Sequence, residues 1–563
     1  MVEPDNRCDT RTAIAAACAA GLVCLLVYLR TLGSDFIYTD DPAYVYNNPD
    51  IRNFDWRLIS SAFTQLFAGD YWMPLTWISF AVDYHFWGLN PAGYHLTNSL
   101  LHAVNTGLVV LIADKLLRVE RRGLRVEGIS EELSSSLNSH CSSYFILLLA
   151  GLLWGLHPLR AESVAWVAAR KDVLNGVFTL GSILLYLGYV QRRNSPGAGP
   201  TKGYYVASLG LFICSLLAKP VSVVLPVLLL VADWYPLGRL HAEKTAGLLL
   251  EKIPFLACSL AVTGVTVLAK MQYGGLQSAE SLPLLVRVVL SGNAVFEYVR
   301  MTLWPVGIVF FYPLSKPMPA SFIVKTALVA LVTLLFVSQA RKRPWLAASW
   351  FCFLVLLLPV LAFMHNGIDI ALAPRFTYLA SFIASVVLAA ASATLLQKGD
   401  RTGPRLWQRG LVLFLMALVV WYAGISSGLI TAWKDTETLW SRQIDIMPLG
   451  RAYNARGHYY LIRERFPEAV RDFSTALDIA VRAGQPFVDN ILAFRGEAHY
   501  LAGNVEAAVT DYSAAIALNP HPRYFHHRGF ALQALGRTTE AEADFQRSGG
   551  DTGRIIWFDG GEE

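Results

Sequence analysis

Long apolar runs recur along most of this chain, and they constrain its fold more than any other feature. Each run approaches the roughly 20 residues that an α-helix needs to cross a bilayer. The 563 residues are 54% hydrophobic and only 16% charged, whereas soluble globular proteins carry about 25% charged residues. The sequence therefore predicts an all-α, polytopic membrane protein. The expected spans, about eleven, are residues 12–32, 94–117, 143–157, 172–190, 204–219, 221–236, 253–270, 320–340, 344–363, 376–396 and 410–431.

Lys and Arg residues beside the spans set the expected orientation, because basic flanks stay in the cytoplasm. With a cytoplasmic N-terminus, the basic segments all fall on one side: 118–142, 191–203, 237–252, 341–343 and 397–409. The apolar stretch 283–313 is interrupted by Arg287, Glu297 and Pro305, and we expect it to be an interfacial or re-entrant element on the outer side. The C-terminal tail is then also outside.

This pattern divides the chain into four parts. Residues 1–431 form the expected transmembrane domain, whose first outer loop, 33–92, is acidic and aromatic. Residues 432–449 are expected to form a connecting helix, 450–550 a soluble array and 551–563 a tail.

The array shows an internal repeat. Aligning three segments superposes Gly457, Gly496 and Gly529, then an alanine twelve residues later and an aromatic residue four further on. Small residues where two helices cross, followed by an aromatic ring, resemble the tetratricopeptide repeat. We therefore expect about three stacked helix pairs, an architecture that usually binds protein partners.

Asp40 and Asp41, followed by Pro42 in the first outer loop, permit three interpretations. They are a helix cap and turn, part of a metal site, or the base of an enzyme at the membrane face. The metal interpretation is weak because a hard cation needs several oxygen ligands in fixed geometry. The seven cysteines show neither metal-ligand spacing nor a disulfide framework.

Ionisable residues recur where the expected spans meet the outer side, and such placement is costly in a membrane. They are His157, Glu162, Arg170, Lys171, Asp172, Lys219 and Arg375. Individually, they fit a helix hairpin with internal pairs and cations that extend to the interface. Together, opposite an acidic loop, His157, Arg170, Lys171, Lys219 and Arg375 fit a clamp for an anionic phosphate, with Glu162 and Asp172 in support. His95 is a further supporting candidate, although such a histidine is more often simply packed.

Several long motifs together resemble a known family. They are residues 38–51 (YTDDPAYVYNNPDI), 71–106, 156–174 (LHPLRAESVAWVAARKDVL), 217–237, 374–381 (PRFTYLAS) and 433–445. They are similar to bacterial tetratricopeptide-repeat membrane proteins related to the transmembrane O-mannosyltransferases that target cadherins, within the GT-C glycosyltransferases. The resemblance implies a polyprenyl-phosphate sugar donor and carries the acidic motif of that family onto Asp40 and Asp41. Pro374 stands where the pattern has an acidic residue, and the array is short.

The sequence thus predicts a GT-C glycosyltransferase in the bacterial inner membrane, with its array on the extracytoplasmic side. It would transfer a sugar, for which the resemblance points to mannose, from a lipid phosphate to a hydroxyl of a protein or envelope acceptor. No cofactor or metal is expected to be obligatory, although a divalent cation is left open, and no nucleic-acid partner is expected. The alternative is a non-catalytic membrane scaffold that binds envelope proteins through its array.

Overall fold

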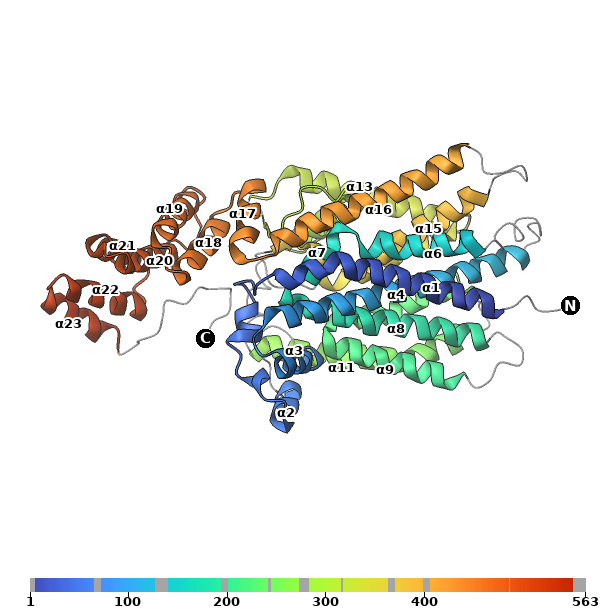
Figure 1. The fold of residues 1–563 in the computed structure, drawn as a ribbon, viewed down its shortest axis with the longest axis horizontal. Coiled ribbons are helices and arrows are strands. Elements are labelled where there is room, and N and C mark those ends of the chain that lie inside the picture. Colours follow the sequence, from blue (N-terminus) through green and yellow to red (C-terminus); the bar gives the residue numbers. More distant parts are fainter. Residues whose placement is uncertain are drawn as a thin grey trace. The chain divides into compact units, whose positions relative to one another are not determined.

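The computed structural model describes residues 6–64, 72–126, 140–193, 201–240, 245–272, 283–314, 317–362, 370–397, 406–485 and 487–549. The predicted tail 551–563 lies outside these residues. The chain forms two compact units. One, the membrane unit, comprises Met1–Phe36 and Asp40–Trp433, and the other, the array unit, comprises Ile37–Thr39 and Lys434–Glu563. Figure 1 shows their helices.

Fifteen described helices make up most of the membrane unit. They are α1 (Asn6–Tyr28), α2 (Trp56–Thr64), α3 (Pro74–Trp87), α4 (Pro91–Val126), α6 (His140–Gly155), α7 (Ala161–Ala165), α8 (Arg170–Arg193), α9 (Lys202–Ala218), α10 (Leu225–Trp234), α11 (Thr245–Gln272), α12 (Leu284–Leu303), α13 (Ala320–Ser338), α14 (Pro344–Leu357), α15 (Phe382–Gln397) and α16 (Leu406–Ala432). Short helical turns between them are η1 (Leu29–Gly33), η2 (Pro42–Tyr46), η3 (Asp50–Arg52), η6 (Pro158–Arg160), η7 (Val167–Ala169), η8 (Pro220–Val224), η11 (Leu358–Val360) and η12 (Pro374–Thr377).

Within the described residues, six helices are long and apolar enough to cross a membrane, and a bent pair in α6 and α7 makes up to seven. Four shorter apolar helices, Lys202–Ala218, Pro220–Trp234, Pro344–Val360 and Phe382–Leu396, occupy the remaining predicted span positions. The predicted all-α, multi-pass class is confirmed. The count of eleven spans and the orientation of the bundle stay predictions.

The long helices of the membrane unit run side by side, with α4 between α1 and α8 (Figure 1). Small residues allow this close approach, as is common between membrane helices. A Cβ built on Gly21 of α1 would lie only 2.8 Å from the Ala103 carbonyl oxygen of α4. The described residues contain one pair of strands, in which β1 (Tyr312–Pro313) pairs antiparallel with β2 (Ile370–Leu372).

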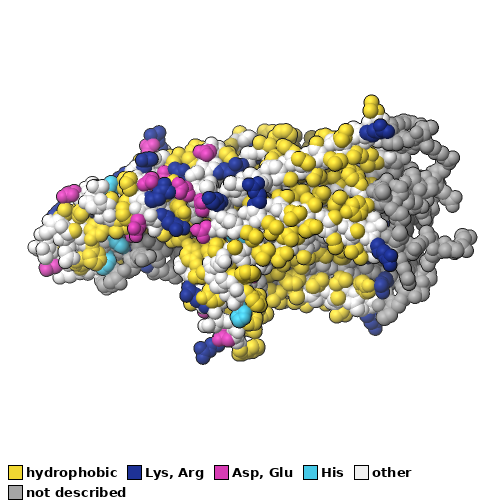
Figure 2. Space-filling model, in the orientation of Figure 1, with side chains coloured by type: hydrophobic (Ala, Val, Ile, Leu, Met, Phe, Trp, Pro, Cys, Tyr) yellow, Lys and Arg dark blue, Asp and Glu magenta, His cyan; other side chains and the backbone are white. Residues whose placement is uncertain are grey.

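The outer surface of the membrane unit is broadly apolar, as the yellow area in Figure 2 shows. Helix α13 illustrates this, since none of its 19 residues is buried. Large exposed apolar surfaces of this kind are unfavourable in water and mark contact with lipid or protein. The bundle is therefore built to sit in a bilayer.

The array unit contains seven helices, which are α17 (Thr436–Ile446), α18 (Gly450–Ile462), α19 (Phe466–Arg482), α20 (Val488–Leu501), α21 (Val505–Leu518), α22 (Pro522–Ala534) and α23 (Thr538–Arg547). From α18 on they pack as three successive pairs. Each pair is held by one bidentate ion pair: Arg456 with Asp472, Arg495 with Asp511 and Arg528 with Asp544. In each pair the repeat glycine faces the repeat aromatic ring, so a larger side chain there would separate the helices.

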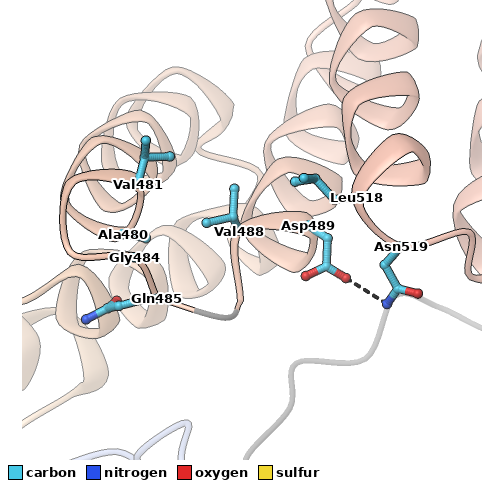
Figure 3. A pocket seen from close by; sticks show the side chains of 8 residues that line it. All are labelled: Ala480, Val481, Gly484, Gln485, Val488, Asp489, Leu518 and Asn519. Atoms are coloured by element: carbon cyan, nitrogen blue, oxygen red, sulfur yellow. Dashed lines mark hydrogen bonds between the residues drawn. The ribbon is translucent and has the colours of Figure 1, made fainter. Parts of the chain in front are cut away.

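One pocket of about 440 Å³ lies in the array unit between the ends of α19, α20 and α21 (Figure 3). Its wall combines apolar side chains, such as Val488 and Leu518, with the polar groups of Asp489 and Asn519. The Asn519 amide donates a hydrogen bond to Asp489 at 2.9 Å. The pocket is thus partly apolar, with one carboxylate at its edge.

Candidate functional site

The acidic motif lies in the segment between α1 and α2. Pro42 begins η2, where it needs no N–H donor and already has a helical φ. The Asp41 side chain is fully buried, and its carboxylate accepts a hydrogen bond of 2.8 Å from the Ala168 N–H of η7. The Asp40 side chain is 31% exposed. The two adjacent carboxylates therefore differ: Asp41 fixes the loop against η7, and Asp40 is accessible.

Lys171, in the first turn of α8, faces this loop. Its ammonium lies 3.8 Å from the Asp40 carboxylate and donates a 3.0 Å hydrogen bond to the Tyr44 hydroxyl. It also lies 4.6 Å from the centre of the Tyr44 ring, a favourable cation–π position. Tyr44 is itself buried, so it holds Lys171 in one orientation.

Lys219 directly follows α9 and pairs with Asp172 of α8. The two side chains are 6% and 7% exposed, and the Lys219 ammonium lies 2.5 Å from Asp172 Oδ1. Asp172 Oδ2 is buried and has no hydrogen-bond partner among the described residues. The Asn175 amide donates to the Lys219 carbonyl at 2.9 Å and so fixes the backbone that carries this lysine.

Arg375 lies in η12 and pairs with Glu162 of α7. The Arg375 guanidinium bonds to one Glu162 oxygen, and the Arg375 backbone N–H donates to the other at 2.9 Å. The family pattern has an acidic residue directly before this arginine, whereas this chain has Pro374 there. Glu162 nevertheless gives Arg375 a carboxylate partner. Burial lowers the pKa of Arg375, but Glu162, Asp172 and Asp40 together raise it more, so the pKa lies above its ordinary value and the group stays charged.

These three ion pairs form one group, which we call the ion-pair cluster. Its members are Lys171 with Asp40, Lys219 with Asp172, and Arg375 with Glu162. Electrostatic interactions connect them: Lys219 interacts with Lys171 and Arg375, and Arg375 interacts with Asp172 and Asp40. Six of the sequence-predicted site residues therefore lie together, although they come from five separate elements of the chain.

Arg170 is a predicted phosphate ligand that the structure places elsewhere. It is fully buried, lies 2.5 Å from Asp83, and donates to the Tyr94 carbonyl at 3.0 Å and to the Asn98 side chain. Its guanidinium is thus used to join α8 to α3 and α4.

The two predicted histidines also lie in packed surroundings. His157 Nε2 is 3.0 Å from the Thr302 carbonyl oxygen, and its Nδ1 accepts the Leu159 N–H at 3.2 Å. His95 is fully buried, and neither of its ring nitrogens has a hydrogen-bond partner among the described residues. Neither imidazole joins the ion-pair cluster.

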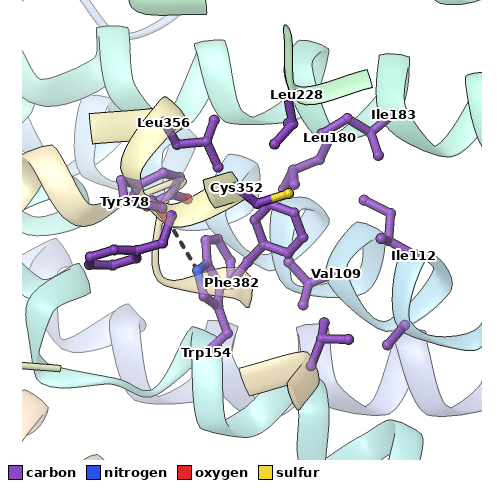
Figure 4. Packing of buried hydrophobic residues seen from close by; sticks show 14 of the residues in the cluster. Val109, Ile112, Trp154, Leu180, Ile183, Leu228, Cys352, Leu356, Tyr378 and Phe382 are labelled. Atoms are coloured by element: carbon purple, nitrogen blue, oxygen red, sulfur yellow. Dashed lines mark hydrogen bonds between the residues drawn. The ribbon is translucent and has the colours of Figure 1, made fainter. Parts of the chain in front are cut away.

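Arg160 is a residue that the sequence analysis missed. It is fully buried and donates to the Thr377 and Tyr378 carbonyls and to the Ser381 hydroxyl. The Trp154 indole also donates to the Tyr378 carbonyl at 3.2 Å, within a packed apolar core (Figure 4). Arg160 therefore positions the segment that carries Arg375. The sequence did contain a signal for Arg160: it is a charged residue, two positions before Glu162, in an otherwise largely apolar stretch.

The charges of the ion-pair cluster balance. Its three cations, Lys171, Lys219 and Arg375, accompany three carboxylates, Asp40, Asp172 and Glu162. Among the described residues, no group of three or more His, Cys, Asp or Glu side chains is arranged to hold a metal ion. An anion that enters the cluster must therefore replace a carboxylate as the partner of a cation.

Comparison with known proteins gives sequence relatives, although no family model matches. The chain is 30% identical over 204 residues to the protein O-mannosyl-transferase tmtc2 of Xenopus laevis, covering 34% of this chain and 20% of that protein. It is 26% identical over 352 residues to human TMTC4, covering 60% of this chain and 43% of that protein. The chain thus matches less than half the length of these relatives. They confirm the resemblance to transmembrane O-mannosyltransferases.

Among solved structures, the chain aligns with ArnT from Cupriavidus metallidurans bound to undecaprenyl phosphate. The alignment covers 94% of this chain and 88% of that one, at 15% identity and a TM-score of 0.35. This score is too low to establish a common fold.

Proposed function

We propose that this chain is a GT-C membrane glycosyltransferase that moves a sugar from a polyprenyl-phosphate carrier to a hydroxyl acceptor. The observation that carries the proposal is the ion-pair cluster, in which three cations from separate segments are grouped and one of them, Lys171, lies 3.8 Å from the accessible carboxylate of Asp40. Lys and Arg are the side chains that bind phosphate. A carboxylate beside them is the base that transfer to a hydroxyl requires.

In this mechanism Asp40 accepts the proton of the acceptor hydroxyl. The acceptor oxygen forms a bond to the anomeric carbon while the bond from that carbon to the phosphate oxygen breaks, with inversion of configuration. One carboxylate is sufficient for such a step, which passes through an oxocarbenium-like state. Lys219 and Arg375 stabilise the charge that develops on the leaving lipid phosphate. The exposure of Asp40 supports it as the base, and the buried Asp41 positions the loop.

Because the charges of the ion-pair cluster balance, the phosphate binds by exchange with its carboxylates. Lys219 and Arg375 are already paired with Asp172 and Glu162. The phosphate oxygens therefore exchange with these carboxylates, and the net affinity is the difference between two ion pairs. Because this net affinity is smaller than that of an unpaired cation, the product carrier can be released after the transfer.

The relatives support the choice of sugar and acceptor, and the Lys and Arg pattern supports the orientation. Their names describe protein O-mannosyl-transferases, so we propose mannose as the sugar and a protein hydroxyl as the acceptor. We further propose a bacterial inner membrane location, with the N-terminus cytoplasmic and the array extracytoplasmic, on the basis of the Lys and Arg pattern. A reporter fused to the C-terminus would test this orientation, and a cytoplasmic reporter would contradict it.

Separate Asp40→Asn and Asp41→Asn variants test the mechanism. We expect Asp40→Asn to abolish transfer, measured as hexose on membrane and envelope proteins by mass spectrometry, while expression stays normal. Asp41→Asn keeps an oxygen that can accept the Ala168 N–H, so it should retain measurable transfer. Full transfer by the Asp40→Asn variant would refute the proposed base.

The second candidate is a membrane scaffold that binds envelope proteins through its array. The pocket lined by Val488, Leu518 and Asp489 is the observation that favours it. The same variants discriminate, because a scaffold would retain its partners and its cellular role after loss of Asp40. Loss of the cellular role with intact partner capture supports the enzyme.

A further inference from the structure

A three-residue segment of the first outer loop belongs to the array unit. Ile37–Thr39 group with Lys434–Glu563, whereas Phe36 before this segment and Asp40 after it belong to the membrane unit. Nearly 400 positions of the chain separate the segment from the array, so no local sequence pattern places it there. The chain therefore passes from the array unit to the membrane unit at the peptide bond that directly precedes Asp40.

Two contacts hold Tyr38 within the array unit. Its backbone N–H donates a 2.8 Å hydrogen bond to the hydroxyl of Thr436, in the first turn of α17. Its ring stacks on the imidazole of His458 in α18, with the ring centres 5.2 Å apart and the planes at 26°, and stacked aromatic pairs of this kind are favourable. One helix thus holds the backbone of Tyr38, and the next holds its side chain.

Both partners of Tyr38 are themselves held in place. Thr436 is buried and directly follows Asp435, whose side chain caps α17. His458 is buried, and its ring packs edge-on against Phe494 of α20 at 5.0 Å. Side chains in such close packing keep one arrangement on average. The array therefore offers Tyr38 one fixed position.

The position of Tyr38 limits where the backbone of Asp40 can lie. Asp40 follows two residues later, and two residues of extended chain span at most about 7 Å. On its other side, the Asp40 carbonyl accepts a 3.0 Å hydrogen bond from the Tyr44 N–H of η2. The array thus holds the chain just before Asp40, and the η2 turn holds it just after.

The Asp40 carboxylate needs this support from its backbone. Its contact with the Lys171 ammonium is 3.8 Å long, beyond hydrogen-bond distance, so this ion pair does not fix the side chain in one orientation. A general base must lie within hydrogen-bond distance of the proton that it accepts, and a displacement of about 1 Å can slow a reaction by about 100-fold.

We propose that Tyr38 and His458 are positioning residues for Asp40, and that through them the array unit takes part in transfer. In this role, which rests on the proposed function of Asp40 as the base, the array is required whether or not it also binds a protein partner. Loss of the stacked pair loosens the base and leaves the phosphate ligands Lys219 and Arg375 in place, because these two belong to the membrane unit.

The kinetics of the full chain in detergent micelles test this role. Hexose transfer to an envelope-protein fraction is measured at varied concentrations of polyprenyl-phosphate mannose. We expect Tyr38→Ala and His458→Ala to lower kcat about tenfold or more and to leave the KM for this donor unchanged. Tyr38→Phe and His458→Phe retain an aromatic pair and should retain kcat.

Gly529→Ala is the matched control, because it perturbs the packing of a different helix pair of the array. It should keep the kcat of the unchanged chain. Full kcat in Tyr38→Ala, or an equal loss of kcat in Gly529→Ala, would overturn the proposal.

Chemical labelling of Asp40 tests the positioning without any transfer reaction. A water-soluble carbodiimide with a small amine modifies accessible carboxylates, and tandem mass spectrometry compares Asp40 with Glu540, an array carboxylate that is 57% exposed. We expect His458→Ala, which leaves the loop sequence intact, to raise the modification rate of Asp40 several-fold and to leave that of Glu540 unchanged. An unchanged Asp40 rate would overturn the positioning, whatever the activity. A raised rate together with full transfer by Asp40→Asn would support the positioning and refute Asp40 as the base.

Discussion

Asp172→Asn is expected to lower the stability of the membrane unit and to raise its affinity for lipid phosphate. The Asp172 carboxylate and Lys219 ammonium are both more than nine-tenths buried and lie 2.5 Å apart. Removing one charge of a buried pair costs about 3–5 kcal/mol in the free energy of unfolding. The same change removes the carboxylate that competes with phosphate for Lys219. A charge-assisted hydrogen bond contributes about 1.5–3 kcal/mol, so binding should tighten roughly tenfold or more.

Two measurements on the full chain in detergent micelles test whether Asp172→Asn lowers stability and raises phosphate affinity. Unfolding by a denaturing detergent gives the change in stability, and titration with undecaprenyl phosphate at fixed pH gives the affinity. Asp83→Asn is the matched control, since Asp83 forms a similarly buried 2.5 Å pair with Arg170 outside the ion-pair cluster. This control should lose comparable stability without tighter binding. Weaker binding by Asp172→Asn, or equal affinity changes in both variants, would refute the role of Lys219 as a phosphate ligand.

Three further predictions concern other parts of the chain. Arg160→Met should destabilise the membrane unit by about 3 kcal/mol or more, since it leaves the Thr377 and Tyr378 carbonyls without their donor. Unfolding by a denaturing detergent measures this loss. A loss below about 1 kcal/mol would contradict the proposed role of Arg160 in positioning the segment that carries Arg375. In the array, Gly529→Ala should lower stability by about 1–2 kcal/mol, whereas Gly496→Ala should be near neutral, because overpacking opposes the gain in helix propensity. The added Cβ would lie 2.6 Å from Phe545 in the first variant but 3.1 Å from Tyr512 in the second. Urea titration followed by proteolysis of the array measures the two stability losses, and a larger loss for Gly496→Ala would contradict this reasoning. Burial lowers the pKa of His458 to about 4. The neutral imidazole therefore contributes fully to array stability above the ordinary pKa near 6.5, and this contribution, up to about 3 kcal/mol, is lost as the pH falls toward 4. The pH dependence of array unfolding should be smaller in His458→Phe, and an unchanged profile would exclude His458 as its source.

The sequence by itself determined the class of fold, and it predicted the charged residues that the structure brings together in the ion-pair cluster. Long apolar runs permit a helical membrane bundle because hydrocarbon satisfies no backbone hydrogen bonds, and each predicted span position contains a helix in the structure. The repeated Gly, Ala and aromatic spacing likewise placed the helix pairs of the array. Charges such as Lys219 and Arg375 were identifiable as candidates because they are costly near lipid.

Tertiary structure alone decided which of these charges work together. Arg170 and Lys171 are adjacent in sequence, yet a helix turns by about 100° per residue, so Arg170 pairs with Asp83 and Lys171 faces Asp40. Asp40 and Asp41 diverge for a similar reason, since η7 provides a backbone N–H to only one of them. Arg160 and Glu162 obtain their roles from contact with η12, more than 200 positions away in the chain. Local pattern can reveal a charge that needs a partner, but only the packing of distant segments supplies that partner.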